Sequence, residues 1–104
     1  MEDGLSIPFL EVKYPKLILK FSAEFCDSCK DPVMLKTLDT LAKTHAYHIE
    51  EIDIEKHSVL CEEYCIRHVP TFVLFDDTSE KITIVGGNIE SMKQWIMRNK
   101  MLDK

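Results

Sequence analysis

Four short segments of this chain have hydrophobic patterns that fit β-strands. Residues 17–22, Leu-Ile-Leu-Lys-Phe-Ser, are apolar and too short for a helix, so they predict a central strand. Residues 71–75, Thr-Phe-Val-Leu-Phe, are rich in aromatic and branched side chains and predict another. A weaker alternation over residues 47–54 predicts a strand between these two. Residues 81–85 are expected to return as the hairpin partner of 71–75.

The longest predicted helix follows the first strand and runs to residue 45. Asp27 or Ser28 can cap its start. Pro32 would then lie inside the helix, where a proline removes one backbone hydrogen bond and clashes with the preceding turn, so we expect a bend near residues 28–29. Its apolar face recurs at helical spacing through Met34, Leu38, Leu41 and Ala42.

Two further helices complete the pattern. A short one is expected from about residue 59 to Arg67, and a last one follows the Gly86-Gly87 break with Met92, Trp95 and Ile96 on its inner face. The order strand, helix, strand, helix, strand, strand, helix predicts an α/β fold. Right-handed crossovers and a mixed sheet with helices on both faces follow from that order.

The length of 104 residues predicts a single domain over residues 1–104. Residues 1–16 predict either an edge strand or a short helix, and Pro8 and Pro15 limit the length of both. A content of 45% hydrophobic and 30% charged residues is typical of a soluble globular protein. The net charge of −5, without a run rich in Lys or Arg, argues against a nucleic-acid partner.

The start of the chain does not predict export or membrane insertion. Residues 1–4 are acidic where a signal peptide would be basic, and the apolar run at residues 17–19 is far too short to span a bilayer. We therefore expect a cytoplasmic protein. In a reducing compartment, two closely spaced cysteines indicate catalysis or metal binding rather than a structural bridge.

Cys26 and Cys29 lie three positions apart directly after the first predicted strand. They could be a redox couple, half of a metal site, or two buried thiols. A helix that begins here would favour the thiolate of Cys26 through its unpaired N–H groups and its dipole. In such motifs the thiol pKa falls from about 8.5 to roughly 3.5–7.5. Cys29, one turn along, is placed to attack a mixed disulfide that Cys26 forms with a substrate.

Cys61 and Cys65 have three interpretations. They could complete a four-thiolate zinc site with the first pair, but their spacing on a helix is unusual for zinc. A disulfide between them is disfavoured, because Cβ atoms of residues i and i+4 on a helix are roughly 5–6 Å apart and a disulfide needs about 3.5–4.5 Å. We expect small buried or half-buried thiols, and we predict no metal site.

Two segments resemble a known family. Residues 20–30, Lys-Phe-Ser-Ala-Glu-Phe-Cys-Asp-Ser-Cys-Lys, resemble the active-site segment of thioredoxins. Residues 65–75, Cys-Ile-Arg-His-Val-Pro-Thr-Phe-Val-Leu-Phe, resemble the segment that carries their cis-proline. With the Val85-Gly86 step before the last helix, the resemblance runs from about residue 17 to residue 98. It implies the thioredoxin fold, a central mixed sheet of four to five strands flanked by helices on both faces.

The resemblance also implies roles for single residues. Cys26 is expected to be the attacking thiol and Cys29 the resolving thiol, with Pro70 as a cis residue that faces them. A cis X–Pro bond is uncommon, about 5–6% of such bonds in folded proteins, so this expectation is specific. The backbone at Pro70 is expected to pair with an extended substrate segment. The substrate-binding residues that the resemblance implies are Phe25, Val69, Pro70, Thr71 and Gly86.

The function implied is the reduction of protein disulfides by a monomer with no bound cofactor, regenerated by a flavin-dependent thioredoxin reductase. A glutathione-regenerated, glutaredoxin-like enzyme is the first alternative, because a Val-Pro step before a strand and Gly86-Gly87 near a helix start also occur in that family. Backbone N–H groups at that start could hold a carboxylate. A non-catalytic adaptor with the same fold is the second alternative, although the presence of both thiols favours an enzyme.

Two departures from the family pattern flank Cys26. Phe25 and Asp27-Ser28 stand where thioredoxins usually have Trp and Gly-Pro. A carboxylate beside a thiolate opposes its formation. Asp27 is therefore predicted to raise the pKa of Cys26 relative to a neutral residue at that position.

Lys20 and Glu51 are predicted to be an exchanged pair. Lys20 stands six positions before Cys26, where thioredoxins bury an aspartate that assists deprotonation of the resolving cysteine, and Glu51 stands where the family's lysine partner would lie. An unpaired buried charge would cost several kcal/mol, so we predict a partly buried, charge-reversed pair in which Glu51 can accept the proton. The alternative is that both side chains extend to solvent.

Overall fold

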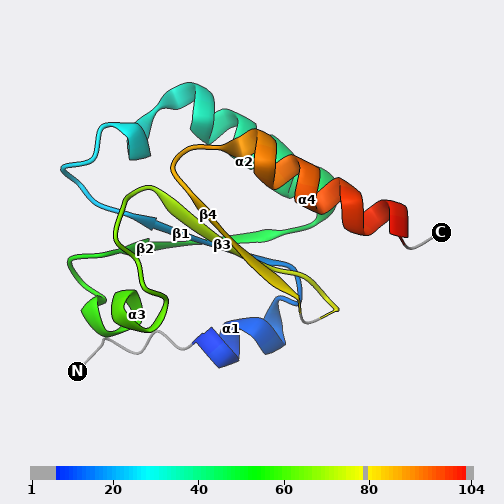
Figure 1. Cartoon of the computed structure of the whole chain (residues 1–104), viewed down its shortest axis with the longest axis horizontal. Coiled ribbons are helices and arrows are strands. Elements are labelled where there is room, and N and C mark those ends of the chain that lie inside the picture. Colours follow the sequence, from blue (N-terminus) through cyan, green and yellow to red (C-terminus); the bar gives the residue numbers. More distant parts are fainter. Residues whose placement is uncertain (1–6, 79, 103–104) are drawn as a thin grey trace.

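The computed structural model describes residues 7–78 and 80–102, and the side chains of residues 98–102 lie outside that description. Three predicted strands, 17–22, 71–75 and 81–85, have the expected bounds, and the strand predicted over 47–54 covers 48–53. In chain order the elements are α1 (Ile7–Lys13), β1 (Leu17–Ser22), the 3-10 turn η1 (Ser28–Lys30), α2 (Pro32–His45), β2 (His48–Asp53), α3 (Ser58–Glu63), β3 (Thr71–Phe75), β4 (Lys81–Val85) and α4 (Ile89–Leu102) (Figure 1).

The strands form one mixed sheet in the order β2-β1-β3-β4. β1 pairs in parallel with β2 and antiparallel with β3, and β3 pairs antiparallel with β4. Figure 1 shows α2 and α4 on one face of this sheet and α1 and α3 on the other. The predicted fold class, an α/β sheet with helices on both faces, is confirmed.

The central strand β1 divides the core between the two faces of the sheet. All six of its residues are buried, as expected of a strand covered on both sides. Side chains alternate along a strand, so Ile18 packs with α2 and α4 whereas Leu19 and Phe21 pack on the opposite face with residues of α1 and α3. The predicted inner face of α4 is confirmed, since the first of these cores contains Met92, Trp95 and Ile96.

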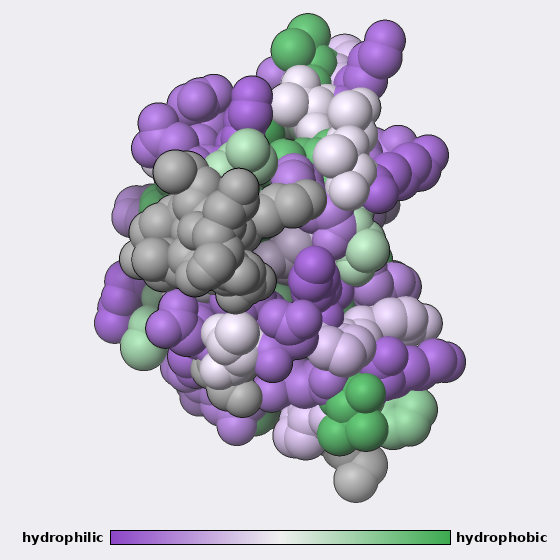
Figure 2. Space-filling view, turned by 90° about the vertical axis from the view of Figure 1, so that its right-hand side faces the viewer, coloured by the Kyte–Doolittle hydropathy of each residue, from purple (hydrophilic) through white to green (hydrophobic). Residues whose placement is uncertain are grey.

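The surface view in Figure 2 faces the end of the molecule that lies at the right of Figure 1. Hydrophilic residues predominate there, and the hydrophobic ones form small separate groups. Among the helices of residues 7–78 and 80–102, none is long and apolar enough to cross a membrane.

The structure defines the conformation of the segment before β1 and the residue at which α3 ends. Of the two possibilities for residues 1–16, the described part forms a helix, α1, which buries Ile7 and Leu10 against the sheet; residues 1–6 lie outside the described residues. The prediction that the third helix extends to Arg67 is wrong, because α3 ends at Glu63. Cys65 adopts a φ of 56°, which a right-handed helix cannot continue through.

The expectation of a bend near residues 28–29 inside one long helix is also wrong. Ser28–Lys30 form a separate 3-10 turn, and α2 begins at Pro32. Proline suits the first position of a helix, because its missing N–H would have no partner there and its φ is already helical. It also drives the preceding residue out of the helical region, and Asp31 has a ψ of 117°. Pro32 therefore separates the thiol segment from α2 and does not kink it.

The turn from α2 into β2 depends on Ala46, which has the left-handed φ of 61°. Its N–H donates to the carbonyl of Ala42, which closes the last turn of α2. Glycine is the usual residue at such a position, because a Cβ makes the left-handed conformation unfavourable by about 1–2 kcal/mol.

Ala46→Gly is expected to stabilise the protein by about 0.5–1 kcal/mol, because relief of the left-handed strain exceeds the extra backbone entropy that glycine loses on folding. Urea unfolding followed by circular dichroism measures the change. Lys36→Gly at an exposed position inside α2 is the matched control, expected to destabilise by about 0.5–1 kcal/mol. A loss of stability in Ala46→Gly would contradict this reading of the turn.

Candidate active site

The two closely spaced thiols are joined by a disulfide at the end of the central strand. Cys26 and Cys29 follow β1 and have Cα atoms 5.3 Å apart. Both residues are buried, with exposed fractions of 8% for Cys26 and 2% for Cys29. They form a small cluster with Ala23, against which Ile54 and Val69 pack. The pair is therefore a redox couple in its oxidised form, and Cys26 is the more exposed residue of the two.

The local backbone holds the sulfur of Cys26 in a polar contact. The N–H of Cys29 donates to Sγ of Cys26 at 3.1 Å, because the turn over residues 26–30 folds back on itself. An N–H aimed at sulfur stabilises the thiolate once the disulfide is reduced. The N–H group that faces Cys26 thus belongs to the 3-10 turn and not to the start of an α-helix as predicted. Its effect on the thiolate stays a prediction.

The loop before β3 faces the disulfide. The Val69–Pro70 peptide bond is cis, as the resemblance implied. The carbonyl oxygen of Val69 lies 3.6 Å from Sγ of Cys26, so the proline loop and the thiol pair lie together. The carbonyl of Pro70 accepts a hydrogen bond of 2.7 Å from the N–H of Gly86, which ties this loop to the end of β4.

Phe25 and Val69 line a shallow hollow beside the disulfide. Phe25 is 69% exposed, which is unusual for a large aromatic side chain in a soluble protein. The hollow has a volume of about 360 Å³ and mostly apolar walls. Residues that follow β2, lie in α3 or precede the cis-proline complete it: Ile54, Ser58, Cys61, Glu62, Ile66, Arg67 and His68.

The predicted substrate residues Thr71 and Gly86 lie near the proline loop, where neither has a side chain that a substrate could contact. Thr71 is buried, and its hydroxyl donates to the carbonyl of His68. Gly86 adopts a φ of 81°, which glycine tolerates without strain. Its N–H is already bonded to Pro70, so it is not open to the carboxylate that the glutathione-based alternative placed at Gly86-Gly87.

Lys20 and Glu51 form the predicted ion pair. They are register partners on β1 and β2, and Nζ of Lys20 lies 3.4 Å from Oε2 of Glu51. The Lys20 side chain is 6% exposed whereas that of Glu51 is 62% exposed. Ser22, the next residue on the same side of β1, donates to the same carboxylate oxygen at 2.9 Å. The predicted contact is confirmed, and the catalytic role of Glu51 stays a prediction.

Asp27 is exposed between the two cysteines and makes no capping hydrogen bond to the turn that it precedes. The nearby ammonium of Lys30 donates to the carbonyl of Glu24. The carboxylate of Asp27 is therefore not committed to the backbone, and it remains a negative charge next to the attacking sulfur.

Sequence reasoning missed the place of Cys61. Cys61 is half-buried, as expected. It also lines the hollow next to Phe25, which was not predicted, and its Sγ lies 4.0 Å from the carbonyl of Ile54. The available signal was its position between the second strand and the proline loop. The expectation of a buried or half-buried thiol is wrong for Cys65, which is exposed and lies beyond α3. Within residues 7–78 and 80–102, no group of three or more His, Cys, Asp or Glu side chains is placed to hold a metal ion.

Comparisons with known proteins agree with this geometry. The family model described as Thioredoxin matches residues 9–98. Thioredoxin-1 of Drosophila yakuba is 37% identical over 74 residues, which cover 69% of this chain and 67% of the relative. Thioredoxin of Chlamydia caviae is 31% identical over 71 residues, covering 67% of this chain and 68% of the relative. The structure of mitochondrial thioredoxin 3 from Saccharomyces cerevisiae is similar with a TM-score of 0.74 and 26% identity, over 86% of this chain and 84% of that one.

Asp27→Asn is expected to lower the pKa of the Cys26 thiol, because removing a negative charge beside the sulfur favours the thiolate. The pH dependence of Cys26 alkylation by iodoacetamide, located by peptide mass spectrometry, measures this in the Cys29→Ser background. Asp77→Asn is the matched control, because Asp77 follows β3 at the other end of the sheet and should leave the profile unchanged. An unchanged or raised pKa in Asp27→Asn would count against the predicted role.

Proposed function

We propose a catalytic cycle for this chain, which belongs to the thioredoxin family and is a thiol–disulfide oxidoreductase that reduces protein disulfides. One observation carries the cycle: the Cys26–Cys29 disulfide directly faces the carbonyl of the cis Val69–Pro70 segment. The oxidised pair represents the state that the enzyme reaches after it has reduced a substrate.

The first step begins from the reduced pair. The thiolate of Cys26 attacks one sulfur of a substrate disulfide, a bond forms between Cys26 and that sulfur, and the second substrate sulfur leaves as a thiolate. Greater exposure of Cys26 than of Cys29 supports its role as attacking group. The N–H of Cys29 supports it further, since it stabilises the sulfur anion before attack.

The second step releases the substrate. Cys29 loses its proton and its thiolate attacks the sulfur of Cys26, so that the Cys26–Cys29 bond forms and the remaining substrate sulfur leaves. The substrate gains two electrons and, with protons from solvent, two thiols, while the enzyme loses the same two electrons. Because Cys29 is 2% exposed, it cannot lose its proton directly to bulk water, and a nearby acceptor would assist. We propose Glu51 for that role.

The substrate segment is proposed to lie in extended form across the proline loop and the hollow beside it. The exposed ring of Phe25 and the apolar walls near Val69 support an apolar side chain next to the substrate cysteine. The carbonyl of Val69, which faces Sγ of Cys26, is a backbone polar group at the same place. The substrates would be proteins whose disulfides lie in accessible, extended segments.

A flavin-dependent thioredoxin reductase is the reductant that we propose for the oxidised pair, with NADPH as the source of electrons. The N–H of Gly86 is bonded to the carbonyl of Pro70, so one of the backbone donors that could hold the carboxylate of glutathione is already occupied. A monomer in the cytoplasm is the proposed setting, because a reducing compartment keeps a dithiol of this kind in its active form.

Insulin-disulfide reduction tests the proposed function. Activity is expected with NADPH and thioredoxin reductase, and rates close to buffer alone are expected with glutathione and glutathione reductase. Cys26→Ser should abolish turnover because no attacking thiolate remains, and Cys29→Ser should trap a mixed disulfide visible by mass spectrometry. Cys65→Ser, an exposed thiol outside the hollow, is the matched control and should keep full activity. Activity with neither reductant would favour the adaptor alternative.

Glu51→Gln is expected to slow release of the substrate from the mixed disulfide by about tenfold, which is below the usual contribution of a general base. Rapid-mixing measurements with a model disulfide should show attack by Cys26 at an unchanged rate. Glu51→Asp should restore part of the release rate, since a carboxylate is again present.

Glu50→Gln is the matched control for this effect. Glu50 neighbours Glu51 on β2 but pairs with His48 at 3.0 Å, away from Lys20. It should leave both steps unchanged. Equal slowing in the Glu50 and Glu51 variants, or an unaltered release rate in Glu51→Gln, would exclude Glu51 as the acceptor without affecting the roles of the two cysteines.

A further inference from the structure

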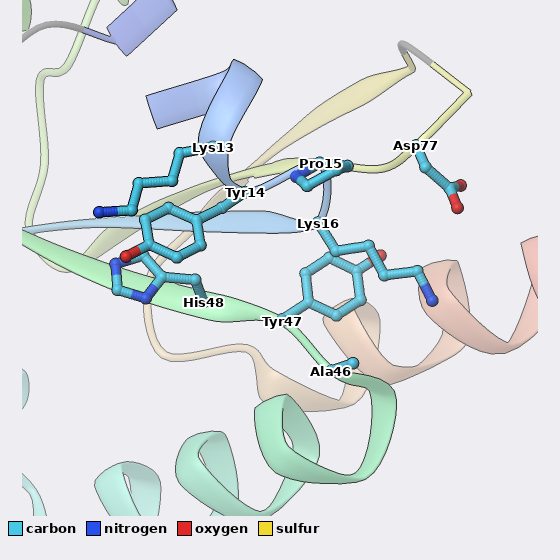
Figure 3. Close-up of a pocket in the computed structure, with 8 residues that line it drawn as sticks. All are labelled: Lys13, Tyr14, Pro15, Lys16, Ala46, Tyr47, His48 and Asp77. Atoms are coloured by element: carbon cyan, nitrogen blue, oxygen red, sulfur yellow. The ribbon is translucent and has the colours of Figure 1, made fainter. Parts of the chain in front are cut away.

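A second hollow lies at the opposite end of the sheet from the disulfide. Its volume is about 430 Å³, and residues of the α1–β1 link and of the start of β2 line it (Figure 3). Lys16 directly precedes β1 and Cys26 follows it. The six residues of β1 rise about 3.3 Å each, so the two sites are about 20 Å apart. The thiol chemistry does not use this hollow.

Two lysines, Lys13 and Lys16, and one carboxylate, Asp77, line this hollow. Neither Lys13 nor Lys16 has a carboxylate within 4.0 Å among the described residues, whereas Lys20 and Lys43 both do. Nζ of Lys13 lies 5.5 Å from the ring centre of Tyr14, and Nζ of Lys16 lies 5.9 Å from that of Tyr47. Nζ of Lys16 also donates to the carbonyl of His45 at 3.4 Å. Each ammonium therefore lies near an aromatic ring and keeps N–H donors for an anion.

Three aromatic residues, Tyr14, Tyr47 and His48, line the hollow between the lysines. Tyr14 and His48 stack with ring centres 3.7 Å apart and planes 9° apart, and Nε2 of His48 lies 3.0 Å from Oε1 of Glu50. Burial, with smaller contributions from Asp76 and Asp77, raises the pKa of Tyr47 to about 12. Its hydroxyl stays protonated at neutral pH and is a hydrogen-bond donor.

The positions of the charged groups indicate the shape of the ligand. Figure 3 shows the ammonium groups of Lys13 and Lys16 pointing to opposite sides of the hollow, with the rings of Tyr14 and Tyr47 between them. A single small anion would reach one lysine only. Asp77 is the one carboxylate among the lining residues, and Figure 3 shows it at the edge, beyond Pro15. An extended ligand with negative groups at two points fits this arrangement.

We propose that this hollow binds an extended acidic segment of a partner protein, with carboxylates on both sides of one apolar side chain. Lys13 and Lys16 would each pair with a carboxylate, and the rings of Tyr14 and Tyr47 would contact the apolar side chain between them. The two lysines would attract the carboxylates of the segment at close contact, whereas Asp77 in the lining and Glu50 beside His48 would oppose this attraction. A long polyanion such as nucleic acid would also meet the net charge of −5, which repels it.

The test uses nuclear magnetic resonance titration of the full chain with a blocked pentapeptide of two glutamates, one leucine and two glutamates. Amide shifts are expected at Tyr14, Tyr47 and His48, and the same peptide with glutamines should bind much more weakly. The Lys13→Gln/Lys16→Gln variant should bind about tenfold more weakly, as expected for the loss of two exposed ion pairs. Lys43→Gln, an exposed lysine on α2 outside the hollow, is the matched control and should bind like the wild type.

Three results would overturn the proposal: equal affinity of the wild type and the double lysine variant, equal affinity for the glutamine peptide, or tighter binding of a five-nucleotide single-stranded DNA than of the acidic peptide. Circular dichroism of the double variant checks that it is folded, which the exposed position of Lys13 and the partial exposure of Lys16 favour. Insulin reduction by the double variant should equal that of the wild type, so the outcome is independent of the redox function.

Discussion

The antiparallel pairing of β1 with β3 determines where both ends of this molecule place their chemistry. Phe21 lies opposite Thr71, so the chain that leaves β1 toward Cys26 meets the chain that enters β3 from Pro70. At the other end Leu17 lies opposite Phe75, which brings the α1–β1 link next to the turn after β3. A shift of one residue in this register would turn every side chain of β1 to the opposite face, and burial on both faces prevents it.

The ion pair inside the sheet shows how a buried ammonium is accommodated. Lys20 lies in the central strand with 6% of its side chain exposed, where an unpaired charge would be strongly unfavourable. Glu51 lies on β2, at the edge of the sheet; its side chain is 62% exposed, and its carboxylate contacts both Lys20 and Ser22. The carboxylate thus stays in water and still neutralises the lysine. A carboxylate in contact with both solvent and the interior is also suited to pass a proton between them.

Much of the fold and of the active site was predictable from residue patterns. Period and composition identified the strands because residues 17–22 and 71–75 have no helical alternative at that length. The cis state of Pro70 and its place beside Cys26 followed from a resemblance of two segments, which local pattern alone would not supply. Pro32 was misjudged because a proline is equally compatible with the interior kink and the first turn of a helix, and only the backbone at Asp31 distinguishes them.

The hollow lined by Lys13 and Tyr47 was not predictable for a different reason. Its residues come from three connections that are far apart in sequence and carry no shared motif. The same holds for Cys61, which joins the active-site hollow only because β2 and α3 return it toward Phe25. Sequence patterns predict helices and strands because these are periodic. Which irregular connections lie side by side depends on the order and register of the strands, which local patterns do not give.

The balance of local forces at Cys26 explains how an acidic insert is compatible with thiol chemistry. Hydrogen bonds to a charged group are worth about 1.5–3 kcal/mol, and the N–H of Cys29 is aimed at Sγ of Cys26 at 3.1 Å. Two unit charges in water interact by only about 1 kcal/mol even at 4 Å, and the carboxylate of Asp27 is exposed to water. The favourable term is therefore the larger one. Asp27 adjusts the reactivity of Cys26 without preventing formation of its thiolate, and the cysteine pair remains competent for exchange.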